Sequence, residues 1–238
     1  MTPAETGFVI IIVVITLAGA AFVVQSLENQ RQQKRSALRA LRADIRYAEQ
    51  IRDGFPSELM SPQLAEFLSH YLTAQWRKLL TLDNSAAMQN AAKASVSQQP
   101  APPTPYKAGS LTRLHDKDQA LKAAAMSKEL AAWLKNLANR NRQSASTISE
   151  LLKYCHYCVQ QVAVDGLVFD ALEYQAVKGP KPALHQFKNC LHTLERIDHR
   201  HFTDRQIYEL RTYVTELEAS LQDAKDPASP DNIEEQEG

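Results

Sequence analysis

The order of apolar and polar positions divides the chain into one long apolar run and a series of amphipathic helices. Residues 8–24 (FVIIIVVITLAGAAFVV) carry no charge, and Thr16 is their only polar side chain. A helix of this length rises about 25 Å, against a hydrocarbon core of roughly 30 Å in a bilayer. We therefore expect a transmembrane anchor over residues 8–26, preceded by a short flank over residues 1–7.

Basic residues follow the apolar run, and none precedes it. Glu5 is the only charged side chain before the run. The basic residues that come first after it are Arg31, Lys34, Arg35, Arg39, Arg42 and Arg46. Because Lys and Arg are enriched on cytoplasmic flanks, this asymmetry predicts a single-pass protein of a bacterial inner (plasma) membrane, with its N-terminus outside and its C-terminal domain in the cytoplasm.

A cleaved signal peptide is the main alternative to an anchor. Ala18-Gly19-Ala20 fits the small-residue cleavage pattern, and the apolar residues ahead of it are long enough for the core of a signal. A signal peptide begins with basic residues, however, and this chain has none there. We therefore favour the anchor.

The helical periodicity continues beyond the apolar run. Four apolar residues at 3-4-3 spacing form a seam that is too short for a coiled coil: Leu38, Leu41, Ile45 and Ala48. The seam predicts that the anchor helix continues as a basic juxtamembrane helix over residues 27–53 and stops at Asp53-Gly54-Phe55-Pro56. Ser61 as N-cap and Pro62 at the first position predict a second amphipathic helix, which we assign to residues 57–83.

A change of composition separates this part from the C-terminal region. Residues 84–110 are rich in Ala, Ser, Gln and Pro, which predicts a disordered linker. Four apolar stripes at helical spacing over residues 111–223 predict a bundle of about four helices. The acidic residues 224–238 predict a disordered tail.

Two local patterns set expectations inside the bundle. Asp165-Gly166 stands between apolar residues, where Asp-Gly often marks a hairpin turn, so we expect a kink or break in the second bundle helix there. Thr203 with Gln206 three residues later predicts a capping box that opens the last helix.

Composition and charge narrow the function classes. The chain has only 7 Gly among 238 residues, which favours an all-α fold. A formal net charge of zero argues against a nucleic-acid partner. The glycine-rich nucleotide-binding motifs and the nucleophile-elbow motif are absent from the sequence, so we predict neither an enzyme nor a cofactor.

One group of residues has metal-ligating chemistry. Cys155, Cys158, Cys190 and His192 are the ligand types of a tetrahedral zinc site. The three cysteines fall on apolar stripes, however, where a free cysteine packs as a small hydrophobic residue. We therefore predict core packing and no metal site.

Two functions from different classes fit these features. The first is a single-pass membrane-anchored scaffold that contacts the lipid bilayer through its anchor and another protein through its helical bundle. A homo-oligomer is also compatible with such a scaffold. The alternative is a membrane-tethered metal- or redox-responsive sensor that uses Cys155, Cys158, Cys190 and His192.

Overall fold

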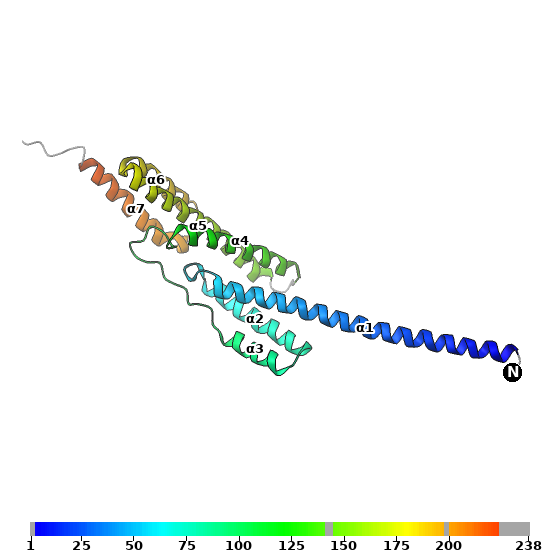
Figure 1. Ribbon diagram of the computed structural model, residues 1–238. Helices are drawn as coiled ribbons and strands as arrows, with labels where there is room; N and C mark the ends of the chain where they lie inside the picture. Colours follow the sequence, from blue (N-terminus) through cyan, green and yellow to red (C-terminus); the bar gives the residue numbers. More distant parts are fainter. Residues whose placement is uncertain (1–2, 141–144, 198–199, 224–238) are drawn as a thin grey trace, which may run out of the picture. The chain divides into compact units, whose positions relative to one another are not determined.

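The regular secondary structure is helical throughout the part of the chain that the structure describes, as predicted (Figure 1). The structure is a computed structural model that describes residues 3–140, 145–197 and 200–223. Within these ranges the side chains of residues 3–21, 23, 145, 200–202 and 223 are not described. The predicted acidic tail, residues 224–238, lies outside the described residues. The α-helices are α1 (Pro3–Gly54), α2 (Pro62–Leu82), α3 (Ala86–Ser97), α4 (Lys117–Arg140), α5 (Ala145–Lys178), α6 (Pro180–Glu195) and α7 (Arg200–Asp223), with the 3₁₀ turn η1 (Ser57–Leu59) between α1 and α2.

Helix α1 runs without interruption from Pro3 to Gly54, which agrees with the predicted continuation of the N-terminal helix. Its residues 24–37 are all exposed, and the predicted seam becomes buried further along, at Ile45 and Ala48. Most side chains of the predicted anchor, residues 8–26, are not among those that the structure describes. Among the side chains that are described, none of the helices contains a segment with the length and apolar character needed to cross a membrane.

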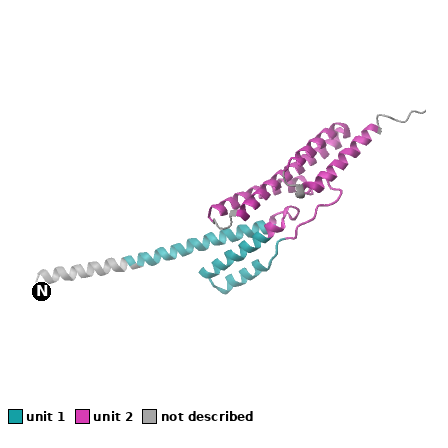
Figure 2. Ribbon diagram, turned by 180° about the vertical axis from the view of Figure 1, so that it is seen from behind, with its two compact units in different colours: residues 1–53, 66–100 teal, residues 54–65, 101–238 magenta. Residues whose placement is uncertain are grey.

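The chain divides into two compact units (Figure 2). Unit 1 combines Met1–Asp53 with Glu66–Pro100, and so contains nearly all of α1, most of α2, and α3. Unit 2 combines Gly54–Ala65 with the chain from Ala101 onward, including α4 to α7. The η1 turn therefore belongs to unit 2, although it stands between two helices of unit 1 in sequence.

The start of α2 is as predicted, and the end of α5 is set by a glycine and a proline. The Ser61 hydroxyl accepts a hydrogen bond from the Leu64 N–H at 3.1 Å, and α2 begins at Pro62. Helix α5 ends at Lys178, and Gly179 follows with φ of 85°, a backbone conformation that side-chain-bearing residues rarely adopt. Pro180 then opens α6.

Helix α3 corrects the prediction of a disordered linker over residues 84–110. Residues 86–97 (AAMQNAAKASVS) are helical, and Ala92 and Ser95 are buried. Alanine has the highest helix propensity of all residues, and five alanines in this short segment outweigh its serines and glutamine. The helix ends before the prolines at 100, 102, 103 and 105, which cannot donate the backbone hydrogen bonds of a helix.

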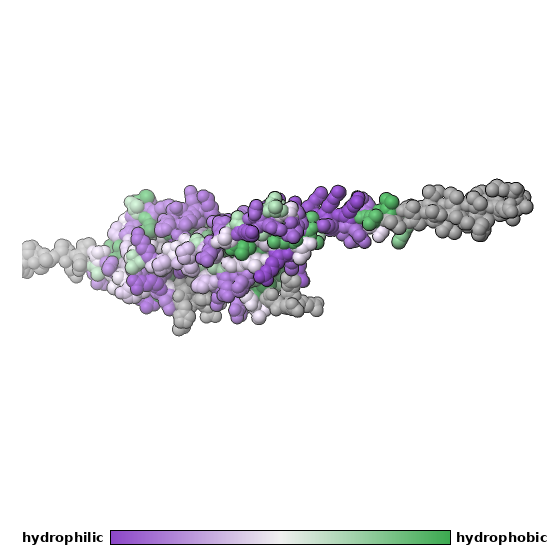
Figure 3. All heavy atoms as spheres, turned by 90° about the horizontal axis from the view of Figure 1, so that it is seen from below, coloured by the Kyte–Doolittle hydropathy of each residue, from purple (hydrophilic) through white to green (hydrophobic). Residues whose placement is uncertain are grey.

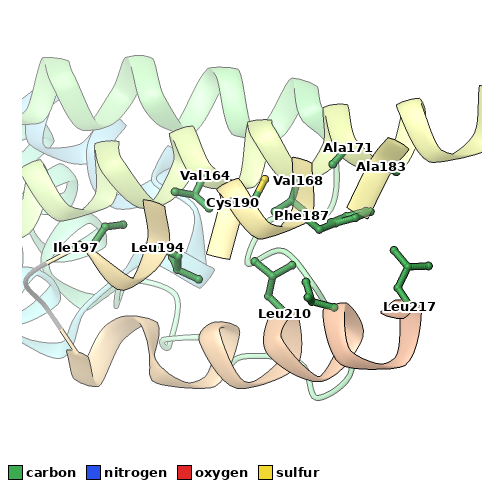
Figure 4. Close-up of a cluster of buried hydrophobic side chains, with 11 residues drawn as sticks. Val164, Val168, Ala171, Ala183, Phe187, Cys190, Leu194, Ile197, Leu210 and Leu217 are labelled. Carbon is green, nitrogen blue, oxygen red and sulfur yellow. The ribbon is translucent and has the colours of Figure 1, made fainter. Parts of the chain in front are cut away.

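The four bundle helices of unit 2 pack in chain order, α4 against α5, α5 against α6, and α6 against α7. Phe187 of α6 lies at the centre of the hydrophobic cluster shared by α5, α6 and α7 (Figure 4). Its ring meets that of Tyr213 edge-on, with centroids 5.0 Å apart. Figure 4 shows Cys190, Leu194 and Leu210 turned toward the same interior.

Two features inside the bundle differ from the predictions. Helix α5 passes through Asp165-Gly166 without a break, because Asp165 is buried and bonded where a turn residue would face solvent. Helix α7 begins at Arg200, so Thr203 and Gln206 lie inside it and do not form a capping box. Helix α4 begins at Lys117, three residues after the buried Leu114.

Candidate functional site

The three cysteines are free and buried in the core of unit 2, as expected for packing residues. Cys155 and Cys158 lie on α5, whereas Cys190 lies on α6 within the cluster around Phe187. Burial raises the pKa of the thiols of Cys155 and Cys158 to about 12 and that of Cys190 to about 11. Because the thiolate is the form that binds metals and attacks disulfides, these thiols are poorly suited to either reaction at neutral pH.

The proposed zinc ligands do not come together. His192 is exposed on α6, whereas Cys190 of the same helix is buried. Over the described ranges, no three His, Cys, Asp or Glu side chains are grouped closely enough to hold a metal ion.

A buried polar network is the most distinctive arrangement in unit 2. Its centre is Asp165 on α5, which is 0% exposed. One carboxylate oxygen, Oδ2, accepts hydrogen bonds from the backbone N–H groups of Arg113 and Leu114, each at 3.0 Å. The carboxylate thereby fixes the segment that leads into α4.

Two buried glutamines complete the network on the other carboxylate oxygen. The Gln206 amide of α7 donates to Asp165 Oδ1 at 2.8 Å and to the Leu111 carbonyl at 2.8 Å. The Gln161 amide, one turn before Asp165 on α5, donates to Gln206 Oε1 and, at 3.4 Å, to Asp165 Oδ1. Asp165 and Gln206 therefore tie α5, α7 and the segment before α4 together.

The electrostatics of Asp165 are dominated by burial. Loss of hydration raises the pKa of its carboxyl to about 6, although the hydrogen bonds from Gln206, Leu114 and Arg113 act in the opposite direction. Burial also raises the pKa of the nearby Tyr106 hydroxyl, with a smaller contribution from the charge of Asp165. The Tyr106 hydroxyl donates to the Ser110 carbonyl, so it helps to shape the same segment.

A second set of contacts fastens η1 within unit 2. The Arg113 guanidinium donates to the Glu58 carbonyl at 2.5 Å, and the Tyr154 hydroxyl donates to the Leu59 carbonyl at 2.7 Å. Thr104 N–H donates to the Ser57 carbonyl at 3.0 Å. Arg113 thus contributes its backbone to Asp165 and its side chain to η1.

The chemistry available at this network is structural. Arg113, Leu114, Gln161 and Gln206 all donate hydrogen bonds to the Asp165 carboxylate and hold it in place. The sequence contains one indication of this network, which is the presence of two polar residues on an apolar stripe. The Asp-Gly pattern favours a helix break at the same place instead. Gln161 and Asp165 stand four residues apart on the apolar stripe of α5, a position where a polar residue needs buried partners.

Neither models of known protein families, nor curated proteins, nor solved structures gave a match to this chain.

Proposed function

We propose that the chain is a single-pass membrane-anchored helical scaffold of a bacterial inner membrane, which holds its two units in the cytoplasm and binds another protein there. The observation that carries this proposal is the continuity of α1. The same helix contains the apolar run of residues 8–24 and, beyond it, the buried Ile45 and Ala48 of unit 1. An anchor built this way is joined to the folded part without a flexible joint.

The exposed stretch of α1 supports the same proposal. Residues 24–37 include Arg31, Lys34 and Arg35, and Figure 3 shows hydrophilic side chains along this exposed stretch of α1, beyond a few hydrophobic ones at its N-terminal side. Basic side chains directly after an apolar helix favour the cytoplasmic side and attract anionic lipid headgroups. An exposed helix with no packing partner is expected where the chain leaves a bilayer.

Membrane fractionation of the full-length chain tests the anchor. We expect the protein to stay in the pellet after alkaline carbonate extraction. The variant Val13→Asp/Val14→Asp should be released, because each acid at the centre of a spanning helix costs about 2.5–3.5 kcal/mol. The matched control, Gln32→Asp/Gln33→Asp, places the same charges on the exposed stretch and should stay in the pellet.

Two further measurements complete this test. A C-terminal green fluorescent protein should fluoresce, and a C-terminal periplasmic phosphatase should be inactive, if the C-terminal part is cytoplasmic. Mass spectrometry of the N-terminus should find the apolar run intact. A mature chain that starts at Ala21, or a carbonate-soluble wild type, would rule out the anchor.

A further inference from the structure

Helices α2 and α3 of unit 1 form an apolar surface groove of about 520 Å³. Trp76 and Leu80 line it from α2, and Ala92 and Val96 line it from α3. Val96 is 45% exposed, although it is an aliphatic residue on a helix whose other face is buried. Trp76 and Ala92 are buried within the unit, whereas Leu80 is half-buried and Val96 is exposed at the groove.

The rim of this groove is basic on both walls. Arg77 of α2 and Lys93 of α3 are exposed lining residues, and none of the residues that line the groove is acidic. Neither cation takes part in an ion pair among the described residues. An occupant with carboxylates beside an apolar face would match this surface in both chemistry and charge.

The groove is preformed, because hydrogen bonds with residues of α1 hold α3 in place. The buried Arg52 donates to the Ser95 carbonyl at 2.7 Å, and the Ser95 hydroxyl donates to Glu49. At the end of α3, the Gln98 amide donates to Asp53 at 3.1 Å. A helix of 12 residues is marginal on its own, so these ties fix the orientation in which α3 presents Lys93 and Val96.

The position of the groove along α1 favours a protein over a lipid as its occupant; this step rests on the proposed function. The Arg42–Asp83 ion pair, at 3.1 Å, and the Arg52 bond to Ser95 mark the two ends of the α2–α3 pair along α1. Arg42 and Arg52 follow Val24 by 18 and 28 residues, or about 27 and 42 Å of helix. The headgroup layer extends only about 5–8 Å beyond the hydrocarbon core on each side, so the groove lies beyond it.

We propose that the α2–α3 groove is the docking site for an amphipathic helix of a partner protein, with aliphatic side chains seated against Trp76, Leu80 and Val96, and with carboxylates facing Arg77 and Lys93. This is the helix-in-groove mode of recognition, in which an apolar face supplies the binding energy. The charges on the two walls orient the partner helix and select acidic sequences.

Photocrosslinking in intact membranes tests this site in the full-length chain. A photoreactive phenylalanine analogue replaces Val96, and the same analogue replaces Val177 of α5, which is 77% exposed, as a control position. We expect a discrete protein adduct at position 96 that is absent at position 177. The crosslinked partner peptide should carry apolar residues at helical spacing with Asp or Glu beside them.

Charge reversal distinguishes docking from chance proximity. Arg77→Glu/Lys93→Glu should lower the yield of the adduct at position 96 at least about tenfold, because the rim would then repel an acidic helix. The matched control is Lys128→Glu/Lys135→Glu, which reverses two exposed charges on α4 and should leave the yield unchanged. Circular dichroism of both variants checks that they fold, as expected for substitutions at exposed positions.

Each remaining outcome overturns the proposal. An adduct with lipid would make the groove a membrane contact, and an adduct with a second copy of the chain would make it a dimer interface. An adduct that charge reversal leaves intact, or no adduct at all, would rule out an acidic partner helix in this groove. Carbonate extraction of the same membranes tests the anchor separately from the docking site. If the chain is extracted but still gives the adduct, the proposed anchor is contradicted and the proposed docking site is not.

Discussion

At the scale of single residues, Asp165 has the most demanding surroundings in the part of the chain that the structure describes. Its carboxylate is buried and faces two backbone N–H groups and two side-chain amides. A carboxylate accepts at both oxygens and therefore suits a site in which these four partners donate. Substitutions that keep the shape of the side chain but change its acceptors should show how much the network stabilises unit 2.

Asp165→Asn is expected to lower the free energy of unfolding by about 2 kcal/mol at pH 7. The amide has one acceptor and one donor, so its NH₂ group must face a donor that the carboxylate had satisfied, and an unsatisfied buried group costs roughly 1–3 kcal/mol. Urea unfolding measures the difference. Asp170→Asn on the same helix is the control, because its contact with Lys117 is exposed and its loss should cost less than about 1 kcal/mol. Equal stability of Asp165→Asn and wild type would contradict a structural role for the charge.

The pH dependence of this site has a definite sign. The pKa of Asp165 is about 6 in the folded protein and 3.8 in the unfolded chain, so the folded state binds the proton more tightly. The stability linked to this proton is fully present below about pH 3.8 and is lost as pH rises through 6, a change of about 3 kcal/mol. Carbon-13 NMR of the carboxyl should show the titration, and the stability gap between wild type and Asp165→Asn should narrow from pH 4 to pH 7. A carboxyl that titrates near pH 4 would refute this.

The cysteines of unit 2 can be predicted from the sequence, whereas the Asp165 network cannot. Cys155, Cys158 and Cys190 were recognisable as core residues because helical spacing alone places them on apolar stripes. Asp165 was not, because its partners Arg113, Leu114 and Gln206 are distant in sequence. Local patterns predict a kink or break of the helix at Asp165 and a cap at Gln206, and only the tertiary arrangement shows that the two side chains meet.

At the scale of elements, the reliable signals were those that act through the backbone. The stop at Gly54, the Ser61 cap and the Gly179-Pro180 boundary depend on residues whose conformational preferences are strong in any context. The sequence does not predict helix α3, because its alanines are followed by a proline-rich segment and the two together have the composition of a linker. Arg52 and Glu49 of α1 form hydrogen bonds with Ser95 of this helix, and both are more than 40 residues away in sequence.

Gly179→Ala is expected to destabilise unit 2 by about 1–3 kcal/mol. Gly179 has φ of 85° and ψ of 175°, a region that is almost restricted to glycine. Gly166→Ala is the matched control, because Gly166 lies inside α5 with nothing within 4 Å of an added Cβ. That variant should be about 0.5–1 kcal/mol more stable than wild type, since alanine favours the helix. Thermal unfolding of both variants gives the comparison, and changes of the same sign would contradict this account.

At the scale of the whole molecule, the division into two units does not follow the order of the chain. Unit 2 takes in residues 54–65 and 101–116 besides the bundle helices. The sequence predicted the bundle over residues 111–223 from its apolar stripes, but not that preceding segments are part of the same unit. Their attachment depends on single polar contacts, such as Arg113 with Glu58 and Tyr154 with Leu59.

Truncation should expose this dependence. A fragment of residues 101–223 keeps Leu111, Arg113 and Leu114, whereas a fragment of residues 117–223 loses the buried Leu114 side chain and two hydrogen bonds to Asp165. We expect the shorter fragment to be at least about 4 kcal/mol less stable, from lost burial of one leucine and two charge-assisted hydrogen bonds. Urea titration followed by circular dichroism measures both fragments. Matching midpoints would show that residues 101–116 contribute little.

The continuity of α1 has a consequence for angular register. An α-helix turns about 100° per residue. The number of residues between the apolar run and Ile45 therefore sets the direction of the packed face of α1 relative to the apolar run. Inserting one residue into the exposed stretch 24–37 would swing unit 1 by about 100° about the helix axis, whereas inserting seven would return it almost to its starting azimuth. The length of this stretch therefore sets the direction in which the α2–α3 groove faces.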